Sequence, residues 1–143
     1  MYFKKFKIRN RNRRGGPKGA AAVEAALCIP AVIILMFGTL ETCSSIFLSE
    51  SLKIVAYEGA RVGVRRGATA ERVSARCQEI LTARQVTGAT ITVVPTDFSE
   101  LDALEPISVT VSAPYNENSR FVFSIFAGRT NDATVSMMRE FDD

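Results

Sequence analysis

An apolar run from Ala20 to Leu40 constrains this chain more than any other feature of its sequence. One charged residue, Glu24, interrupts the run, and none occurs from Ala25 to Leu40. As an α-helix with a rise of about 1.5 Å per residue, the run spans roughly 30 Å, which is the thickness of the hydrocarbon core of a bilayer. Core helices of soluble domains seldom continue this far without a polar face. We therefore expect a transmembrane helix over residues 20–40.

The segment before this run, residues 1–19, is a basic leader without any acidic residue. Its cations are Lys4, Lys5, Lys7, Arg9, Arg11, Arg13, Arg14 and Lys18. Glu41 and Glu50 follow the run on its other side. Because basic flanks of a membrane helix stay in the cytoplasm, we expect the leader there and the residues after Leu40 outside.

Three other interpretations of the run stay open: a buried helix of a soluble domain, a secretory signal peptide, and an uncleaved single-pass anchor. A signal peptide would be cut behind the apolar run, after small residues in an A-x-A-like pattern. Residues 37–43 offer no good site of this kind, and Leu40-Glu41-Thr42 does not suit lipoprotein cleavage before Cys43. The sequence therefore favours a membrane-inserted helix whose leader is either removed or retained.

Glu24 is the residue of the run that most needs an explanation. A carboxylate in a membrane helix costs about 3 kcal/mol at the bilayer centre and less near the interface, so such residues usually serve a partner. If the chain is cut after Gly19, the new amine of Ala20 lies about one turn from Glu24. Either this amine or that of a neighbouring subunit can pair with the carboxylate. Alternatively, Glu24 lies at the headgroup level beside the leader and needs no partner.

The same junction carries a resemblance to a known family. The segment Arg14–Leu27 resembles the start of the TadE-like pseudopilins, minor pilins of the tight-adherence (Tad) pilus, a type IV-like pilus. Further similar segments follow in the same order: Ile29-Pro30, Phe37-Gly38, Tyr57–Arg61, Ile107–Val111, Pro114-Tyr115 and Ala133–Glu140. One departure is Ala25, where the family usually has Phe or Tyr. The resemblance implies that a prepilin peptidase cuts between Gly19 and Ala20, and that the chain works with other pilin-like subunits.

The helical pattern continues beyond the membrane, and we expect a helix extension over residues 41–67. Its apolar residues recur at a spacing of three to four: Ile46, Phe47, Leu52, Val55 and Val62. Gly59, Gly63 and Gly67 are four residues apart, a spacing that lets two helices approach closely. Gly59 and Gly63 either contact another pilin-like subunit or pack on the chain's own sheet, and Gly67 is expected to end the helix.

Residues 68–143 predict a small exported α+β domain, in which helices pack on an antiparallel sheet of three or four strands. A second helix begins after Thr69, its expected N-cap, and its buried face is expected to hold Val73, Cys77, Ile80 and Leu81. The expected strands are Thr90–Val94, Ile107–Val111 and Ala133–Met138. Residues 98–105 and 114–120 are expected to form loops, and residues 121–126 are apolar and ambiguous between strand, short helix and docking patch.

Three cysteines are too few for a disulfide framework. Cys28 lies in the apolar run and is expected to be a packing residue. Cys43 and Cys77 are both expected outside, where a bridge between them is one possibility and two independent thiols are the favoured one.

The composition argues against an enzyme. The chain has no histidine, which excludes His-dependent triads and His-bound zinc, and its cysteines lack metal-site spacing. No cofactor or metal site is therefore expected. Removal of the leader leaves ten Lys or Arg against fifteen Asp or Glu, a net charge of −5. An acidic outer domain disfavours nucleic acid as a partner.

Taken together, the residues predict a bitopic protein of the cytoplasmic membrane with a small exported domain. The resemblance implies that it is a minor pilin or pseudopilin, processed after Gly19, that serves a Tad-type pilus or a related secretion apparatus at the membrane or cell surface. The alternative is an uncleaved membrane-anchored binding module of the cell envelope.

Overall fold

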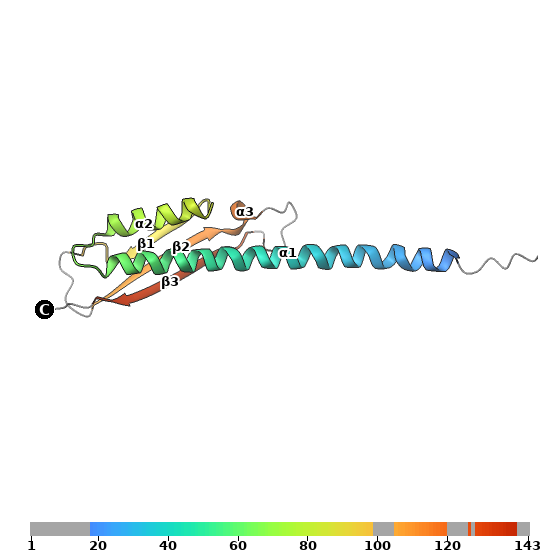
Figure 1. Ribbon diagram of the computed structural model, residues 1–143, viewed down its shortest axis with the longest axis horizontal. Coiled ribbons are helices and arrows are strands. Elements are labelled where there is room, and N and C mark those ends of the chain that lie inside the picture. Colours follow the sequence, from blue (N-terminus) through green and yellow to red (C-terminus); the bar gives the residue numbers. More distant parts are fainter. Residues whose placement is uncertain (1–17, 99–104, 120–125, 127, 140–143) are drawn as a thin grey trace, which may run out of the picture. The chain divides into compact units, whose positions relative to one another are not determined.

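The computed structural model describes residues 18–98, 105–119, 126 and 128–139 (Figure 1). Its helices are α1 (Lys18–Gly63), α2 (Ala70–Ala83) and α3 (Tyr115–Asn118), and its strands are β1 (Thr90–Val94), β2 (Pro106–Pro114) and β3 (Thr130–Met138). The chain divides into two compact units, Met1–Met36 and Phe37–Asp143, and α1 has residues in both. A long apolar helix and a small domain of helices with an antiparallel sheet confirm the predicted α+β class.

The described part of the first unit is helical, and every residue from 19 to 36 is exposed. Among the described residues, one helix is long and apolar enough to cross a membrane, and this stretch belongs to it. A helix satisfies its backbone hydrogen bonds internally, which is the condition for an isolated segment in lipid. This part of α1 therefore fits a single-pass membrane anchor. The leader expected over residues 1–17 lies outside the described residues.

The second unit is built around a three-stranded antiparallel sheet in the order β1-β2-β3. Thr110 of the central strand pairs with Thr92 on one side and Thr134 on the other. Because side chains alternate along a strand, the two faces of β2 differ. One face buries Ile107, Val109, Val111 and Ala113, and the other carries Ser108, Thr110 and Ser112. The sheet can therefore cover a core on one face only.

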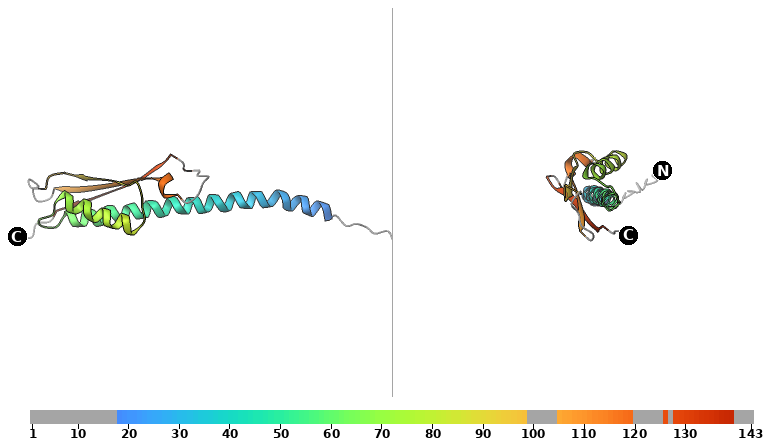
Figure 2. Two further views of the ribbon diagram at one scale, coloured as in Figure 1. Left: turned by 90° about the horizontal axis from the view of Figure 1, so that it is seen from above. Right: turned by 90° about the vertical axis from the view of Figure 1, so that its left-hand side faces the viewer.

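Helices α1 and α2 lie side by side on one face of this sheet (Figure 2). They form one core cluster with the apolar side chains of the strands. Residues buried in α1 include Leu48, Leu52, Val55, Ala56 and Ala60. Residues buried in α2 are Val73, Cys77 and Leu81. The predicted buried face of α2 is thus correct except at Ile80, which is only partly buried.

Thr69 caps α2 as predicted. Its backbone is extended, with φ −130° and ψ 157°, and its side chain accepts a hydrogen bond from the Arg72 amide at 3.3 Å. A free amide in the first turn is thereby satisfied. The backbone amide of Glu71 and, to a smaller extent, the Thr69 side chain lower the pKa of the Glu71 carboxyl by hydrogen bonding.

Several helices and strands differ in length from their predicted ranges. Helix α1 ends at Gly63, and Gly67 lies in the following turn with φ +69°, where a residue without a side chain is favoured. Strands β2 and β3 each extend beyond their predicted ranges because both pair along their whole length. The apolar residues expected over 121–126 and the loop over 98–105 lie mostly outside the described residues.

Burial departs from the sequence pattern at two places. Ile46 and Phe47 share the apolar stripe of the helix with Leu52 and Val55, but Ile46 and Phe47 are exposed whereas Leu52 and Val55 are buried. Tyr115 lies in a stretch expected to be a polar loop, but it is fully buried at the start of α3. Its hydroxyl donates a hydrogen bond to the Glu41 carbonyl at 3.0 Å, and its ring meets Phe126 edge to face. A polar end and an apolar ring together allow tyrosine to be buried here.

Candidate processing and assembly sites

The predicted cleavage point lies in the first turn of α1, which begins at Lys18. Both Gly19 and Ala20 are exposed, and a Cβ added at Gly19 would meet no atom within 4 Å. The first four amides of a helix have no intrahelical acceptor, so this turn opens at a lower cost than any turn inside the helix. The structure therefore leaves the Gly19–Ala20 peptide bond accessible.

Glu24 lies on the same exposed helix, four residues after Ala20. Residues four apart on a helix are neighbours on its surface. A new amine on Ala20 would therefore start within reach of the carboxylate while the first turn stays helical.

Gly59 and Gly63 face the interior of the exported domain. A Cβ built at Gly59 would collide with Cys77 Sγ and lie 3.3 Å from Val109 Cγ1. A Cβ at Gly63 would lie 3.2 Å from Ile107 Cγ2. These glycines let α1 approach α2 and the sheet closely, and packing on the chain's own sheet accounts for these contacts.

The three cysteines are separate thiols. Cys43 is exposed, whereas Cys77 is buried and its Sγ lies 3.7 Å from the Val55 carbonyl as a hydrogen-bond donor. Val55 is twelve residues beyond Cys43 on the same helix, about 18 Å along its axis. No bridge joins Cys43 to Cys77, because Cys77 packs against the turn of α1 that contains Val55, and this turn is too far along the helix from Cys43. Burial raises the pKa of the Cys77 thiol to about 11.

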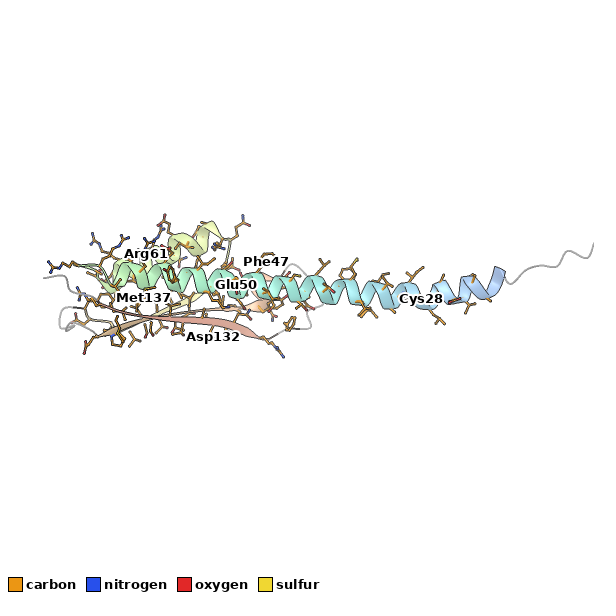
Figure 3. All side chains as sticks on the ribbon, turned by 60° about the horizontal axis from the view of Figure 1, so that its bottom comes forward. Cys28, Phe47, Glu50, Arg61, Asp132 and Met137 are labelled. Carbon is orange, nitrogen blue, oxygen red and sulfur yellow. The ribbon has the colours of Figure 1, made fainter. Side chains whose placement is uncertain are left out.

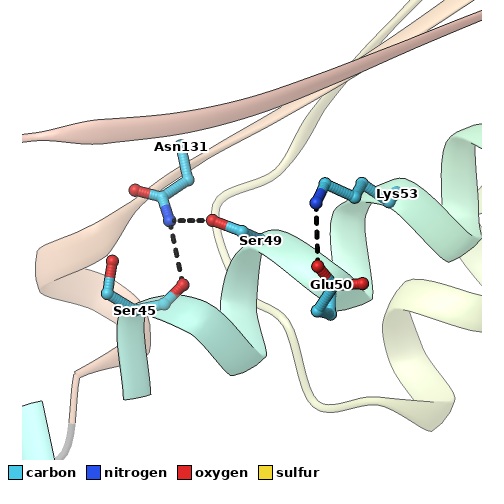
Figure 4. Close-up of polar contacts among 5 residues, drawn as sticks. All are labelled: Ser45, Ser49, Glu50, Lys53 and Asn131. Atoms are coloured by element: carbon cyan, nitrogen blue, oxygen red, sulfur yellow. Dashed lines mark hydrogen bonds and ion pairs between the residues drawn. The ribbon is translucent and has the colours of Figure 1, made fainter. Parts of the chain in front are cut away.

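Two side chains tie α1 to the C-terminal part of the sheet. The Asn131 amide donates to the Ser45 carbonyl at 3.2 Å and to Ser49 Oγ at 2.8 Å (Figure 4). Tyr115 makes the corresponding bond to the Glu41 carbonyl. These bonds, 74 to 86 residues apart in sequence, fix which face of α1 turns toward the sheet.

The opposite face of α1 carries exposed apolar side chains that the sequence analysis did not identify as a separate surface. We call it the outer stripe, and it consists of Leu40, Cys43, Phe47, Glu50, Ile54, Tyr57 and Arg61. Phe47, Glu50 and Arg61 are labelled on α1 in Figure 3. At 100° per residue, the stripe lies about 180° from the buried residues of α1. The sequence contained a signal for this surface, because residues 41–61 have apolar residues on two faces of the helix. Only one of these faces can pack on the sheet.

Comparison with known proteins gives one match. The family model described as "TadE-like protein" matches residues 19–61. No curated protein and no solved structure matches the chain. The matched segment begins at the predicted cleavage point and ends in the last turn of α1, so it contains Glu24 and the whole outer stripe. This match confirms the resemblance to the TadE-like family that the sequence motifs indicated, over residues 19–61 of α1.

Proposed function

We propose that this protein is a minor pilin or pseudopilin of a Tad-type pilus or a related secretion apparatus, and that a prepilin peptidase processes it after Gly19. The observation that carries the proposal is the start of the family match at residue 19, at the exposed first turn of an apolar helix. A segment that is only an anchor has no physical reason to place a glycine, a cleavable turn and a carboxylate in this order. The role we propose is structural and not catalytic.

The proposed processing step is hydrolysis of the Gly19–Ala20 peptide bond. Glycine before the bond leaves room for an approaching peptidase, since nothing lies within 4 Å of the position of a Cβ there. Removal of the basic leader abolishes the charges that hold the N-terminus in the cytoplasm and creates an amine on Ala20. That amine neutralises Glu24, in the same chain or in a neighbouring subunit, and thereby lowers the cost of a carboxylate in the bilayer.

The membrane location follows the same reasoning. We propose the cytoplasmic membrane, with the N-terminus inside and the exported domain outside, as the site where the precursor waits for assembly. The hydroxyl-bearing face of β2 and the exposed face of α2 suit an aqueous compartment. In this arrangement the exported domain caps, starts or modifies a filament built from other pilin-like subunits.

The N-terminal residue and intact mass of the native protein, isolated from its own cell envelope, test the processing step. A start at Ala20 supports the proposal, and Gly19→Leu should then leave the full-length chain. Gly16→Leu, which places the same side chain three residues upstream, is the matched control and should still be cut. A wild-type chain that begins at Met1 in the native envelope would refute the proposal and favour an uncleaved anchor.

Assembly is tested separately with Glu24→Gln, which keeps the shape of the side chain and removes its charge. We expect correct processing but loss of the protein from sheared pili, or fewer pili. Glu79→Gln on the exposed face of α2 is the control and should assemble normally. Normal assembly of Glu24→Gln would contradict the pairing role of the carboxylate.

A further inference from the structure

We propose that the exported domain binds an acidic sugar, a monosaccharide unit that carries a carboxylate, in a pocket where α1, the end of α2 and α3 meet (Figure 1). We call it the Arg84 pocket, and its volume of about 350 Å³ lies in the range of small-ligand sites. The inference rests on the outside location of this domain contained in the proposed function, since a surface glycan can be met only there. The pocket is lined by Ser44, Phe47, Leu48, Ser51, Arg84, Gln85, Val86 and Asn118.

The charge of the pocket selects an anionic ligand. Among the described residues that line it, Arg84 is the one charged residue, and its side chain is exposed. Its Nη1 donates to Ser51 Oγ at 3.4 Å, which leaves other N–H groups of the guanidinium for a ligand. Paired N–H groups of a guanidinium match the two oxygens of a carboxylate. Because the C-terminal end of α2, with its negative dipole, lies at the pocket, a single negative charge suits it better than the double charge of a phosphate.

The backbone of the pocket wall is already in use. The amides of residues 84–86 donate to the carbonyls of Ile80, Thr82 and Leu81. The Thr87 amide donates to Asn118 Oδ1 at 2.9 Å. An extended peptide is recognised through hydrogen bonds to backbone groups, and these amides have none to offer. The wall therefore favours a ligand that bonds to side chains.

The polar side chains of the pocket suit a ligand with hydroxyl groups. Ser51 Oγ accepts from Arg84 and can still donate. Ser44 Oγ donates to the Leu40 carbonyl at 3.0 Å and can still accept. The Gln85 side chain is exposed and carries both donors and an acceptor. Each hydroxyl of a sugar ring also donates and accepts, so it matches this mixed set.

Phe47 supplies an aromatic surface at the edge of the same pocket. Its side chain is 74% exposed on α1 (Figure 3). Leu48, the next residue of the lining, is buried. Binding sites for small ligands combine such an aromatic surface with a few polar groups that fix the orientation of the ligand. The apolar face of a sugar ring can lie on Phe47 while its carboxylate meets Arg84.

The backbone of Gln85 gives an independent argument. Its φ is +57°, directly after the C-cap of α2. Glycine is the residue favoured at this position after a helix, because it has no Cβ to strain a left-handed conformation. The Gln85 side chain makes no hydrogen bond to any described part of the chain, so it does not repay this strain within the fold. Such strain is found at functional sites, and here it places an amide at the pocket.

Binding of the detergent-solubilised full chain to immobilised galacturonate and glucuronate oligomers, measured by biolayer interferometry, tests the charge argument. Neutral galactose oligomers, which lack the carboxylate, should bind at least about tenfold more weakly, and Arg84→Gln should lose at least about tenfold in affinity for the acidic oligomers. Arg65→Gln removes the same charge from an exposed position in the turn after α1 and should bind as wild type does. No binding of wild type to either acidic oligomer, or an equal loss in both variants, overturns the proposal.

Gln85→Gly separates a ligand contact from a structural role. We expect a higher Tm, because the strain is relieved, together with a several-fold weaker affinity for the acidic oligomers. A residue with a structural role alone would change only Tm, so unchanged affinity overturns the role of Gln85.

Phe47→Ala tests the aromatic surface and should weaken binding several-fold without lowering Tm. Ile46→Ala is its matched control, because Ile46 is also exposed on α1 but does not line the pocket, and it should bind as wild type does. Equal affinities of these two variants overturn the contact with Phe47.

Competition identifies the chemistry of the ligand. Free galacturonate should release the chain from the oligomer, whereas inorganic phosphate or a short acidic peptide at the same concentration should not. Release by the peptide or by phosphate, but not by galacturonate, overturns the sugar assignment. Binding of purified chain does not depend on leader removal. A chain that begins at Met1 in its envelope yet binds the sugar keeps this inference and refutes the processing, and a processed chain that does not bind refutes this inference alone.

Discussion

Replacing Gly59 by alanine adds one methyl group where α1 lies against α2 and β2. Two effects oppose each other. Alanine favours an internal helix position over glycine by about 1 kcal/mol. The added carbon collides with Cys77 Sγ and presses on Val109 Cγ1 at 3.3 Å and Val73 Cγ1 at 3.5 Å. Overpacking of a well-packed core costs about 1–3 kcal/mol, so the net loss lies at about 0–2 kcal/mol, and we expect a value of about 1 kcal/mol.

The neighbours of Gly59 explain why relaxation does not remove this cost. Cys77, Val109 and Val73 are all fully buried, and they belong to two different elements. Moving Cys77 Sγ aside also breaks its contact with the Val55 carbonyl. For a domain of roughly 100 residues, a loss of about 1 kcal/mol lowers Tm by about 4–8 °C.

A double-mutant cycle isolates the collision. Cys77→Ala alone should destabilise the domain by leaving a small cavity. In the double variant Gly59→Ala/Cys77→Ala the added methyl group partly refills that space. The double variant should therefore lose less stability than the sum of the two single variants. Urea unfolding of the detergent-solubilised chain, followed by near-ultraviolet circular dichroism of its tyrosines, measures all four proteins. A raised stability of Gly59→Ala, or simple additivity of the two single variants, would refute the close packing described here.

The remaining predictions concern single polar groups of the exported domain. Tyr115→Phe removes the hydroxyl that bonds the Glu41 carbonyl, and should cost about 1 kcal/mol in urea unfolding. Asn131→Ala removes two bonds to α1 and should cost about 1–2 kcal/mol. Thr69→Ala removes the N-cap of α2 and should cost about 1 kcal/mol. The raised pKa of Cys77 favours the neutral thiol in the fold, so its contribution to stability is complete below pH 9 and lost as pH rises through about 11. Wild type should therefore lose stability across this interval relative to Cys77→Ala.

Controls for these predictions use exposed positions of the same elements. Thr82→Ala lies on the exposed face of α2, where its hydroxyl bonds the Gln78 carbonyl, and should change stability by less than about 0.5 kcal/mol. Unchanged stability of Tyr115→Phe would show that its hydroxyl does not tie α3 to α1. A parallel pH dependence of wild type and Cys77→Ala would contradict the burial of this thiol.

Local patterns predicted much of the fold. Strand β1 occurs at Thr90–Val94 as predicted because alternation and flanking turn residues define it within a few positions. The Thr69 cap is local too, since an N-cap bonds an amide only three residues away. The TadE-like match to α1 agrees with the motifs seen around Gly19.

Contacts between distant segments were not predictable in this way. The apolar stripe identified over residues 41–61 mixes two faces of the helix: Leu52 and Val55 are buried, whereas Ile46 and Phe47 are exposed. Tyr115 looked like part of a polar loop because its partner, the Glu41 carbonyl, is 74 residues away.

By itself, the sequence determined the properties that depend on neighbours along the chain: an apolar helix that fits a membrane anchor, a predicted cleavage point before it, and the periods of the helices and strands that follow. Only the tertiary structure decided which face of α1 meets the sheet. Gly59 and Gly63 fit beneath Cys77 and Ile107, while Asn131 and Tyr115 hold the helix in that rotation. The physical reason is that periodicity groups residues on a face, whereas burial of that face requires a complementary surface from elsewhere in the chain. The same choice left the outer stripe exposed.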